Sequence, residues 1–217
     1  NIMKMDVNTI TTNDIRMYLA QFAKTGVKNS TIRSETDVLR GFFNWLEIEE
    51  YIEKNPMKKI KTMKKEVREK EPLTAMEVEI LRKGYRDARD KAIIELALAT
   101  GLRVSEVVSL NISDINYTSK SIKVIGKGSK ERTIYFNPKA ELAIKEYLLT
   151  RNDDCEALFI TQRKPYTRMS VDAVQRALKI VAKNSGLKKN VHFHLLRHTT
   201  ATSLLKKGVN ITSIKEL

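Results

Sequence analysis

The segment ARDKAIIELALATGLRVSEV, residues 88–107, carries the strongest structural signal in this chain. Ala, Leu and Ile dominate its first part, and neither Gly nor Pro interrupts them, so we predict a helix over residues 88–100. Gly101 suits the left-handed position after a helix end, and a short second helix over residues 104–110 comes next. Arg103 therefore lies between two helices. We expect the longer helix to bury Ile93, Ile94, Leu96, Ala97 and Leu98.

The segments around this helix pair indicate a mixed domain of helices and a β-hairpin. Thr74 and Glu77 have the spacing of a capping box, which satisfies two free backbone N–H groups at a helix start. The sequence GKGSK, residues 126–130, separates two strand-forming runs, 121–125 and 132–136, that we predict to pair. Further helices are predicted over residues 138–150, 170–185 and 193–207, and from Ile211 onward.

The first 55 residues are predicted to be helical. Thr12 or Asn13 caps a helix that ends near Gly26, Ser30 caps a second helix, and Pro56 stops the segment after it. The expected apolar faces are Ile15, Tyr18, Leu19 and Phe22 on the first helix and Ile32, Leu39, Phe42, Phe43 and Leu46 on the second. Helices this short make an incomplete bundle, so we expect further helices before Asn1.

Composition divides the chain into a helical domain over residues 1–56, a basic linker over residues 57–72 and a second domain over residues 73–217. The expected fold class is mainly α with a small antiparallel β-sheet. The positive charge of the linker region suits a phosphate backbone, and a solvated loop or helix face is an equally good interpretation. Its basic residues are Lys54, Lys58, Lys59, Lys61, Lys64, Lys65, Arg68 and Lys70.

The chain as a whole is strongly basic. Its 217 residues include 40 Lys and Arg against 26 Asp and Glu, a net charge of +14. Such an excess favours a polyanionic partner, because neutralising phosphates releases condensed counterions. The single cysteine, Cys155, excludes a disulfide framework and fits a reducing cytoplasm. No apolar run has membrane-spanning length and no signal peptide is visible, so we expect a cytoplasmic, nucleoid-associated protein without a membrane partner.

Two arginines and a histidine can together hold a phosphate group. Arg103 can donate two hydrogen bonds to phosphate oxygens, and Glu106, three residues on, can orient its guanidinium; a surface Arg–Glu pair is the plainer interpretation. His194 and Arg197 are three residues apart and share one helix face, beside a helix N-terminus that favours an anion. His198 points elsewhere, and we expect it to have a packing or supporting role.

Lys127 lies at the tip of the predicted hairpin with a glycine on each side. The glycines let the backbone approach a ligand, and the lysine supplies a mobile proton donor; an exposed turn lysine is the alternative. The loop does not have the spacing of a P-loop. The three histidines lack zinc-site spacing and there is no cysteine pair, so we expect neither a metal nor a cofactor. His192 has no evident role.

The order and combination of these motifs resemble the tyrosine recombinases, also called the phage integrase family, and are most like the Xer-like and transposon- or phage-integrase members. The motifs that support the resemblance are ATGLRVSE (99–106), VIGKGSKER (124–132) and HLLRHTTAT (194–202), with FFNWL (42–46) and Asn55-Pro56 in the N-terminal part. The resemblance implies a helical core-binding domain followed by an α+β catalytic domain.

It also implies a site-specific recombinase that breaks and rejoins DNA through a 3′-phosphotyrosine intermediate. The implied catalytic residues are Arg103, Lys127, His194 and Arg197, with Glu106 and His198 in support. The family's tyrosine nucleophile follows the second arginine, whereas all seven tyrosines here precede Arg197. We therefore expect no nucleophile within this chain, no cleavage by the chain alone, and the tyrosine segment just beyond Leu217.

The implied partner is a double-stranded DNA recombination site, bound by a homotetramer of the full-length protein; this chain alone can remain monomeric. One alternative is a shortened relative that binds recombination sites and regulates without cutting. A type IB topoisomerase, which shares the catalytic residues, is a weaker alternative because of the short chain. DNA contacts are expected from Lys58, Lys59, Lys61, Lys64, Lys65, Lys130 and Arg132.

Overall fold

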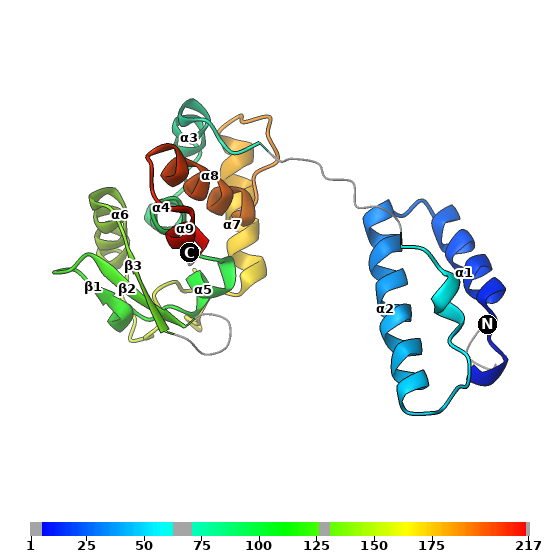
Figure 1. The fold of residues 1–217 in the computed structure, drawn as a ribbon. Helices are drawn as coiled ribbons and strands as arrows, with labels where there is room; N and C mark the ends of the chain where they lie inside the picture. The colour runs from blue at the N-terminus through cyan, green and yellow to red at the C-terminus, as the bar shows by residue number, and fades with distance from the viewer. Residues whose placement is uncertain (1–5, 63–70, 126–130, 216–217) are drawn as a thin grey trace. The chain divides into compact units, whose positions relative to one another are not determined.

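The computed structural model describes residues 6–62, 71–125 and 131–215, and for residues 214 and 215 the backbone only. The chain divides into two compact units, Asn1–Glu69 and Lys70–Leu217, both drawn in Figure 1. Each unit has its own hydrophobic core. Helices dominate, and the described strands form one small antiparallel sheet, so the predicted fold class is confirmed. No helix in the described part is long and apolar enough to cross a lipid bilayer.

The N-terminal unit is built on two helices that lie side by side, α1 and α2 (Figure 1). Its elements are η2 (Val7–Thr9), α1 (Thr12–Lys24), α2 (Asn29–Ile48) and η3 (Pro56–Lys59), where η denotes a short 3-10 helix. Its buried core consists of Ile15, Phe43, Leu46, Ile52 and Met57. Phe42, predicted to lie on the apolar face of the second helix, is largely exposed instead.

The helix starts in this unit differ from the predicted ones by one or two residues. Thr11, rather than Thr12 or Asn13, caps α1, because its hydroxyl accepts from the Asp14 N–H while the Asp14 carboxylate accepts from the Thr11 N–H at 2.8 Å. This reciprocal pair needs an acidic residue three positions after the cap, which only Thr11 has. α2 begins without a side-chain cap, and Ser30 lies within its first turn.

The N-terminal unit extends beyond the predicted boundary at residue 56. Met57 is 2 % exposed and belongs to the core, and the Arg40 guanidinium donates to the carbonyl of Ile60 at 3.1 Å. The start of the predicted linker over residues 57–72 is therefore packed structure. Burial of one methionine contributes about 1.5–3 kcal/mol, and the neighbouring Lys58 and Lys59 stay exposed, so the segment packs without burying their charges.

The C-terminal unit combines helices with a three-stranded antiparallel sheet in the order β1-β2-β3. Its helical elements are α3 (Ala75–Arg82), α4 (Ala88–Thr100), α5 (Val104–Ser109), η4 (Ile112–Asp114), α6 (Pro138–Leu149), α7 (Val171–Asn184), α8 (Phe193–Lys206) and α9 (Ile211–Lys215). The strands are β1 (Ile115–Asn116), β2 (Ser121–Ile125) and β3 (Glu131–Tyr135). In register, Ile122 lies opposite Ile134 in the core. The hairpin was predicted, whereas β1 was not.

Helix α4 is the centre of this unit, with α3, α6, α7 and α8 around it in Figure 1. Its Ala, Ile and Leu side chains are buried, apart from Ala88, Leu98 and Ala99, which are partly buried. Two carboxylates on α4 are also buried, and each is paired: Asp90 with Arg86 and Glu95 with Arg82. Burial of a carboxylate is tolerated only with such a partner, so these pairs hold α4 in one position.

The end of α3 packs directly against the backbone of α7. A Cβ atom added to Gly84 would lie 2.1 Å from the carbonyl oxygen of Val181 and 2.9 Å from the amide nitrogen of Ser185. Both neighbours are backbone atoms, which cannot rotate away. The absence of a side chain at Gly84 is therefore what allows the two helices to approach this closely.

We predict that Gly84→Ala lowers the free energy of unfolding of the C-terminal unit by about 2–3 kcal/mol, because the methyl group must push α3 away from α7. Gly186→Ala is the matched control: its φ is +74°, but a Cβ there would meet nothing within 4 Å. It should cost about 1–2 kcal/mol of left-handed backbone strain and nothing from a steric clash. Urea unfolding followed by circular dichroism compares the two variants, and equal losses would contradict the close packing.

Candidate active site

The turn after α4 brings Arg103 to the start of α5. Gly101 ends α4 with φ 66° and ψ 18°, the predicted left-handed conformation, and its N–H donates to the carbonyl of Ala97. Two residues later, Arg103 is the N-cap of α5. Its side chain is 52 % exposed, so the guanidinium can meet a ligand from solution.

Glu106 holds Arg103 in place. Its Oε2 accepts from the Arg103 backbone N–H at 2.8 Å, and its Oε1 accepts from Arg103 Nη1 at 3.0 Å. Glu106 is 7 % exposed. Burial acts to raise the pKa of its carboxyl group, but hydrogen bonds from Arg103 and Arg132 outweigh that effect, and the pKa is lowered. The carboxylate is therefore ionised at neutral pH and orients Arg103, as the spacing of the two residues suggested.

Arg132 is the second cation on this carboxylate. Its Nη2 donates to Glu106 Oε1 at 2.9 Å, and its side chain is only 20 % exposed. The prediction that Arg132 contacts DNA stays a prediction, and in the structure this guanidinium bonds Glu106. The two residues are 26 positions apart, on β3 and α5, so no local spacing could have indicated the pair.

Helix α8 supplies the other half of the site. Arg197 Nη1 donates to the carbonyl oxygen of Gly101 at 2.6 Å, and Thr200 Oγ1 donates to the carbonyl of Leu98 at 2.9 Å. These bonds fasten α8 to the end of α4. Arg197 is thus bonded to the same turn that leads into Arg103, and the prediction that the two hold a phosphate stays a prediction.

The start of α8 is set by a histidine. His192 is the N-cap, and its Nδ1 accepts from the N–H of Leu195 at 3.1 Å. No sequence pattern indicated this role, because histidine is an uncommon cap. With the helix starting at Phe193, His194 lies in its first turn and is exposed, as is His198.

Positive charge accumulates around the Glu106 carboxylate. Burial, followed by the charge of Arg103, lowers the pKa of Arg197, and the negative charge of Glu106 partly offsets this. Arg103 and Arg132 both bond the Glu106 carboxylate, and Arg197 is close enough to feel the same charges, so the positive potential here favours an anion. Lys127 and Lys130 lie outside the described residues. Within the described residues, no three His, Cys, Asp or Glu side chains gather as a metal site.

Comparison with known proteins gives consistent matches over nearly the whole chain. The profile described as "Phage integrase family" matches residues 65–217. The tyrosine recombinase XerC of Histophilus somni is 33 % identical over 215 residues, which cover 96 % of this chain and 72 % of that protein. XerC of Bacillus subtilis is 31 % identical over 218 residues, which cover 94 % and 71 %.

Solved structures show the same fold. The Tn1549 transposon integrase in complex with circular intermediate DNA matches with a TM-score of 0.81 at 21 % identity, over 97 % of this chain and 78 % of that one. A lambda integrase dimer bound to a COC′ core site matches with a TM-score of 0.80 at 22 % identity, over 97 % and 79 %. XerA recombinase is 27 % identical, with a TM-score of 0.63, over 99 % and 76 %.

We predict that Glu106→Gln lowers stability at neutral pH by about 1–3 kcal/mol, since Arg103 and Arg132 lose a charged acceptor. The folded-state pKa of Glu106 is below its ordinary value of 4.5, so the carboxylate stabilises the fold above that value and the contribution is lost as the pH falls through the folded-state pKa. On acidification from neutral pH to below the folded-state pKa of Glu106, the variant should therefore lose less stability than the parent protein.

Thermal unfolding at several pH values measures this difference. Glu156→Gln is the control, because that side chain is 81 % exposed and its contribution should be small at any pH. An unchanged pH dependence in Glu106→Gln would contradict the assigned role of the carboxylate.

Proposed function

The chain belongs to the phage integrase family, the tyrosine recombinases, and we therefore propose that it takes part in site-specific DNA recombination through a 3′-phosphotyrosine intermediate. The observation that most supports this proposal is the junction of Arg103 and Arg197 at the end of α4, made by the bond from Arg197 to the Gly101 carbonyl. The two arginines are the pair that a transferring phosphoryl group requires, because each guanidinium can bond two phosphate oxygens.

In the proposed mechanism the protein stabilises charge that develops during attack on phosphorus. Arg103 and Arg197 neutralise the non-bridging oxygens, and because Glu106 and the Gly101 carbonyl orient them beforehand, little reorganisation accompanies the reaction. Lys127 is proposed as the general acid for the leaving 5′-oxygen, and His194 as the group that assists proton transfer on the attacking side or bonds a phosphate oxygen. His198 is proposed to support these groups.

The tyrosine nucleophile would come from outside residues 1–217, since every tyrosine of the chain precedes Arg197. Covalent catalysis of this kind keeps the energy of the broken phosphodiester in the protein–DNA link, so we propose no energy-supplying cofactor. The chain alone is proposed to hold a DNA phosphate without cleaving the strand.

Double-stranded DNA is the proposed partner of both units. The excess of positive charge supports it, and relatives with this fold have been solved on DNA, lambda integrase both as a dimer on a core site and as a tetramer on a Holliday junction. We propose the same kind of assembly on DNA for the full-length protein, acting on DNA in the cytoplasm. Among the proposed backbone contacts, Lys59 and Lys61 are exposed, Lys58 is paired with Glu47 at 2.5 Å, and Lys64 and Lys65 lie outside the described residues.

We predict that Arg197→Ala, placed in the product of the whole reading frame, lowers the yield of covalent protein–DNA complex at least about 100-fold, as expected for loss of one preorganised charge donor. DNA binding should remain measurable, because many other cations contribute to it. Arg176→Ala, an exposed arginine on α7, is the matched control and should cleave normally. Denaturing gel electrophoresis of labelled duplex detects the complex, and normal cleavage by Arg197→Ala would overturn the assignment.

The reading frame itself distinguishes recombinase from regulator. Codons beyond Leu217 that specify a histidine or tryptophan and then a tyrosine favour the recombinase. A stop codon directly after Leu217 would instead favour the protein that occupies recombination sites without cutting them.

We predict that the double variant Lys59→Gln, Lys61→Gln lowers the steepness of the salt dependence of duplex binding by about 1.8 in the slope of log affinity against log salt, which corresponds to two phosphate contacts. The control is Lys91→Gln with Lys145→Gln, which removes the same charge from lysines paired with Glu146 and Glu141. Fluorescence anisotropy at several salt concentrations measures both slopes, and equal slopes for the two double variants would place the first pair away from the DNA.

A further inference from the structure

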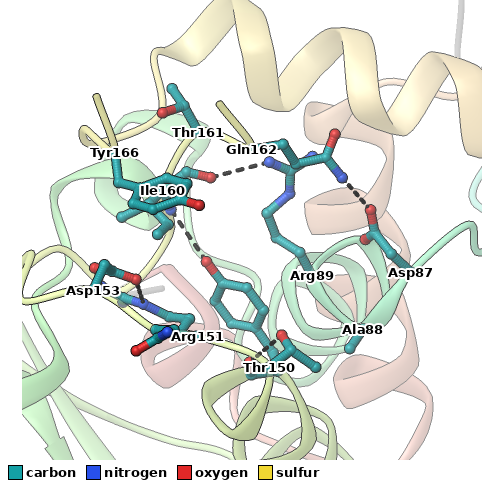
Figure 2. A pocket seen from close by; sticks show the side chains of 12 residues that line it. Asp87, Ala88, Arg89, Thr150, Arg151, Asp153, Ile160, Thr161, Gln162 and Tyr166 are labelled. Atoms are coloured by element: carbon teal, nitrogen blue, oxygen red, sulfur yellow. Dashed lines mark hydrogen bonds and ion pairs between the residues drawn. The ribbon is translucent and has the colours of Figure 1, made fainter. Parts of the chain in front are cut away.

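A cavity of about 290 Å³ lies at the N-terminal end of α4, the end opposite to Gly101 and Arg103. Thirteen residues of helix separate the two ends, a length of about 20 Å. Figure 2 shows that Arg89 extends from α4 towards the backbone at Ile160, with Gln162 beside its guanidinium. The cavity is therefore separate from the candidate active site and uses none of its residues.

Arg89 is a buried cation that the described chain does not neutralise. It is 9 % exposed, and no carboxylate of the described residues lies within 4.0 Å of it. Its one hydrogen bond to the described chain runs from Nη1 to the carbonyl oxygen of Ile160, at 3.0 Å. Its Nε is buried without an acceptor. A buried charge that lacks a counter-ion is costly, so this guanidinium favours an added anion.

Other arginines of the same unit are paired. Arg82 bonds Glu95, and Arg86 bonds Asp90, in each case through two nitrogens of one guanidinium. Arg151, which also lines the cavity, bonds both oxygens of Asp153 and three backbone carbonyls besides. Arg89 differs from all three, because its surroundings supply a single neutral acceptor.

The two carboxylates that line the cavity are already engaged. Asp87 caps α4 through Oδ1, which accepts from the Asp90 N–H at 2.8 Å, while its Oδ2 accepts from Gln162 at 2.6 Å. Asp153 accepts from Arg151 and from the Cys155 N–H at 2.9 Å. Neither carboxylate therefore acts as the counter-ion of Arg89.

A second donor faces the same space. The Tyr147 oxygen accepts from the Ile160 N–H at 3.2 Å, and the hydroxyl hydrogen has no acceptor among the described residues. Burial raises the pKa of Tyr147, although its bond from Ile160 and the charges of Arg151 and Arg89 act in the opposite direction. The hydroxyl is therefore protonated at physiological pH and can donate.

We propose that this cavity binds one carboxylate group, with the Arg89 guanidinium as its counter-ion, the Tyr147 hydroxyl as a hydrogen-bond donor and the positive end of α4 directed towards it. A planar monoanion suits one guanidinium edge. A phosphate dianion fits less well, because Asp87 and Asp153 in the lining repel a dianion more strongly than a monoanion. The volume is at the lower limit for a ligand site, which restricts the occupant to a small acid or to one acidic side chain of a polypeptide.

The test is a titration of the protein with sodium acetate at constant ionic strength, followed through the arginine Nε–H signals in nitrogen-15 NMR spectra. The Arg89 signal, identified by its absence in Arg89→Lys, should shift and reach saturation. The Arg82 signal should not move, because Glu95 already occupies that guanidinium. An equal shift with sodium chloride, a shift without saturation, or an unchanged Arg89 signal would each overturn the proposal.

Arg89→Lys tests the guanidinium as a donor, and Tyr147→Phe tests the hydroxyl. Tyr147→Phe keeps the aromatic ring in place, so it still tests the proposal if Arg89→Lys does not fold. Each should weaken acetate binding about tenfold or more, the loss expected for one hydrogen bond to a charged group. Unchanged affinity in both would place the acetate elsewhere. A blocked tripeptide with one aspartate distinguishes the source: binding at least tenfold tighter than acetate supports a polypeptide carboxylate, and equal or weaker binding supports a free acid.

Discussion

The hydrogen bond from Arg197 Nη1 to the carbonyl oxygen of Gly101 holds the two halves of the candidate active site together. It joins α8 to the turn after α4, across 96 residues of sequence. Gly101 makes the contact possible, because its left-handed backbone ends α4 sharply and places Arg103 at the start of α5. A carbonyl acceptor also orients the Arg197 guanidinium without adding negative charge to a site built to hold an anion.

The candidate active site differs from the adjacent helix α4 in the number of guanidinium groups that bond each carboxylate. Along α4 the buried acids are matched one to one, Glu95 with Arg82 and Asp90 with Arg86, so neither buried carboxylate is left without a cation. At the end of α4 a single carboxylate, Glu106, serves both Arg103 and Arg132 while Arg197 lies nearby. The closely packed helix α4 beneath the site holds these cations in position against their mutual repulsion.

The features that sequence predicts well are local ones. The bounds of α4 and the capping box at Thr74 depend on side chains a few positions apart, and both were found as predicted. β1 is too short to leave a periodic pattern, and the bond between Glu106 and Arg132 joins distant segments that only the folded sheet brings together. Composition alone predicts a linker at residues 57–60, whereas the buried Met57 packs this segment onto the N-terminal core.

The candidate site was predicted mainly from motif order, and the structure adds the reason for its residue types. Burial and the charge of Arg103 both lower the pKa of Arg197. The same surroundings would disfavour the charged form of any basic side chain at this position. An arginine tolerates this, since its ordinary pKa is above about 12. A lysine begins about two units lower, and the same surroundings would bring its titration closer to physiological pH. A guanidinium therefore keeps its charge at that position with a wider margin than a lysine would, and a lysine suits a position where a proton is given up.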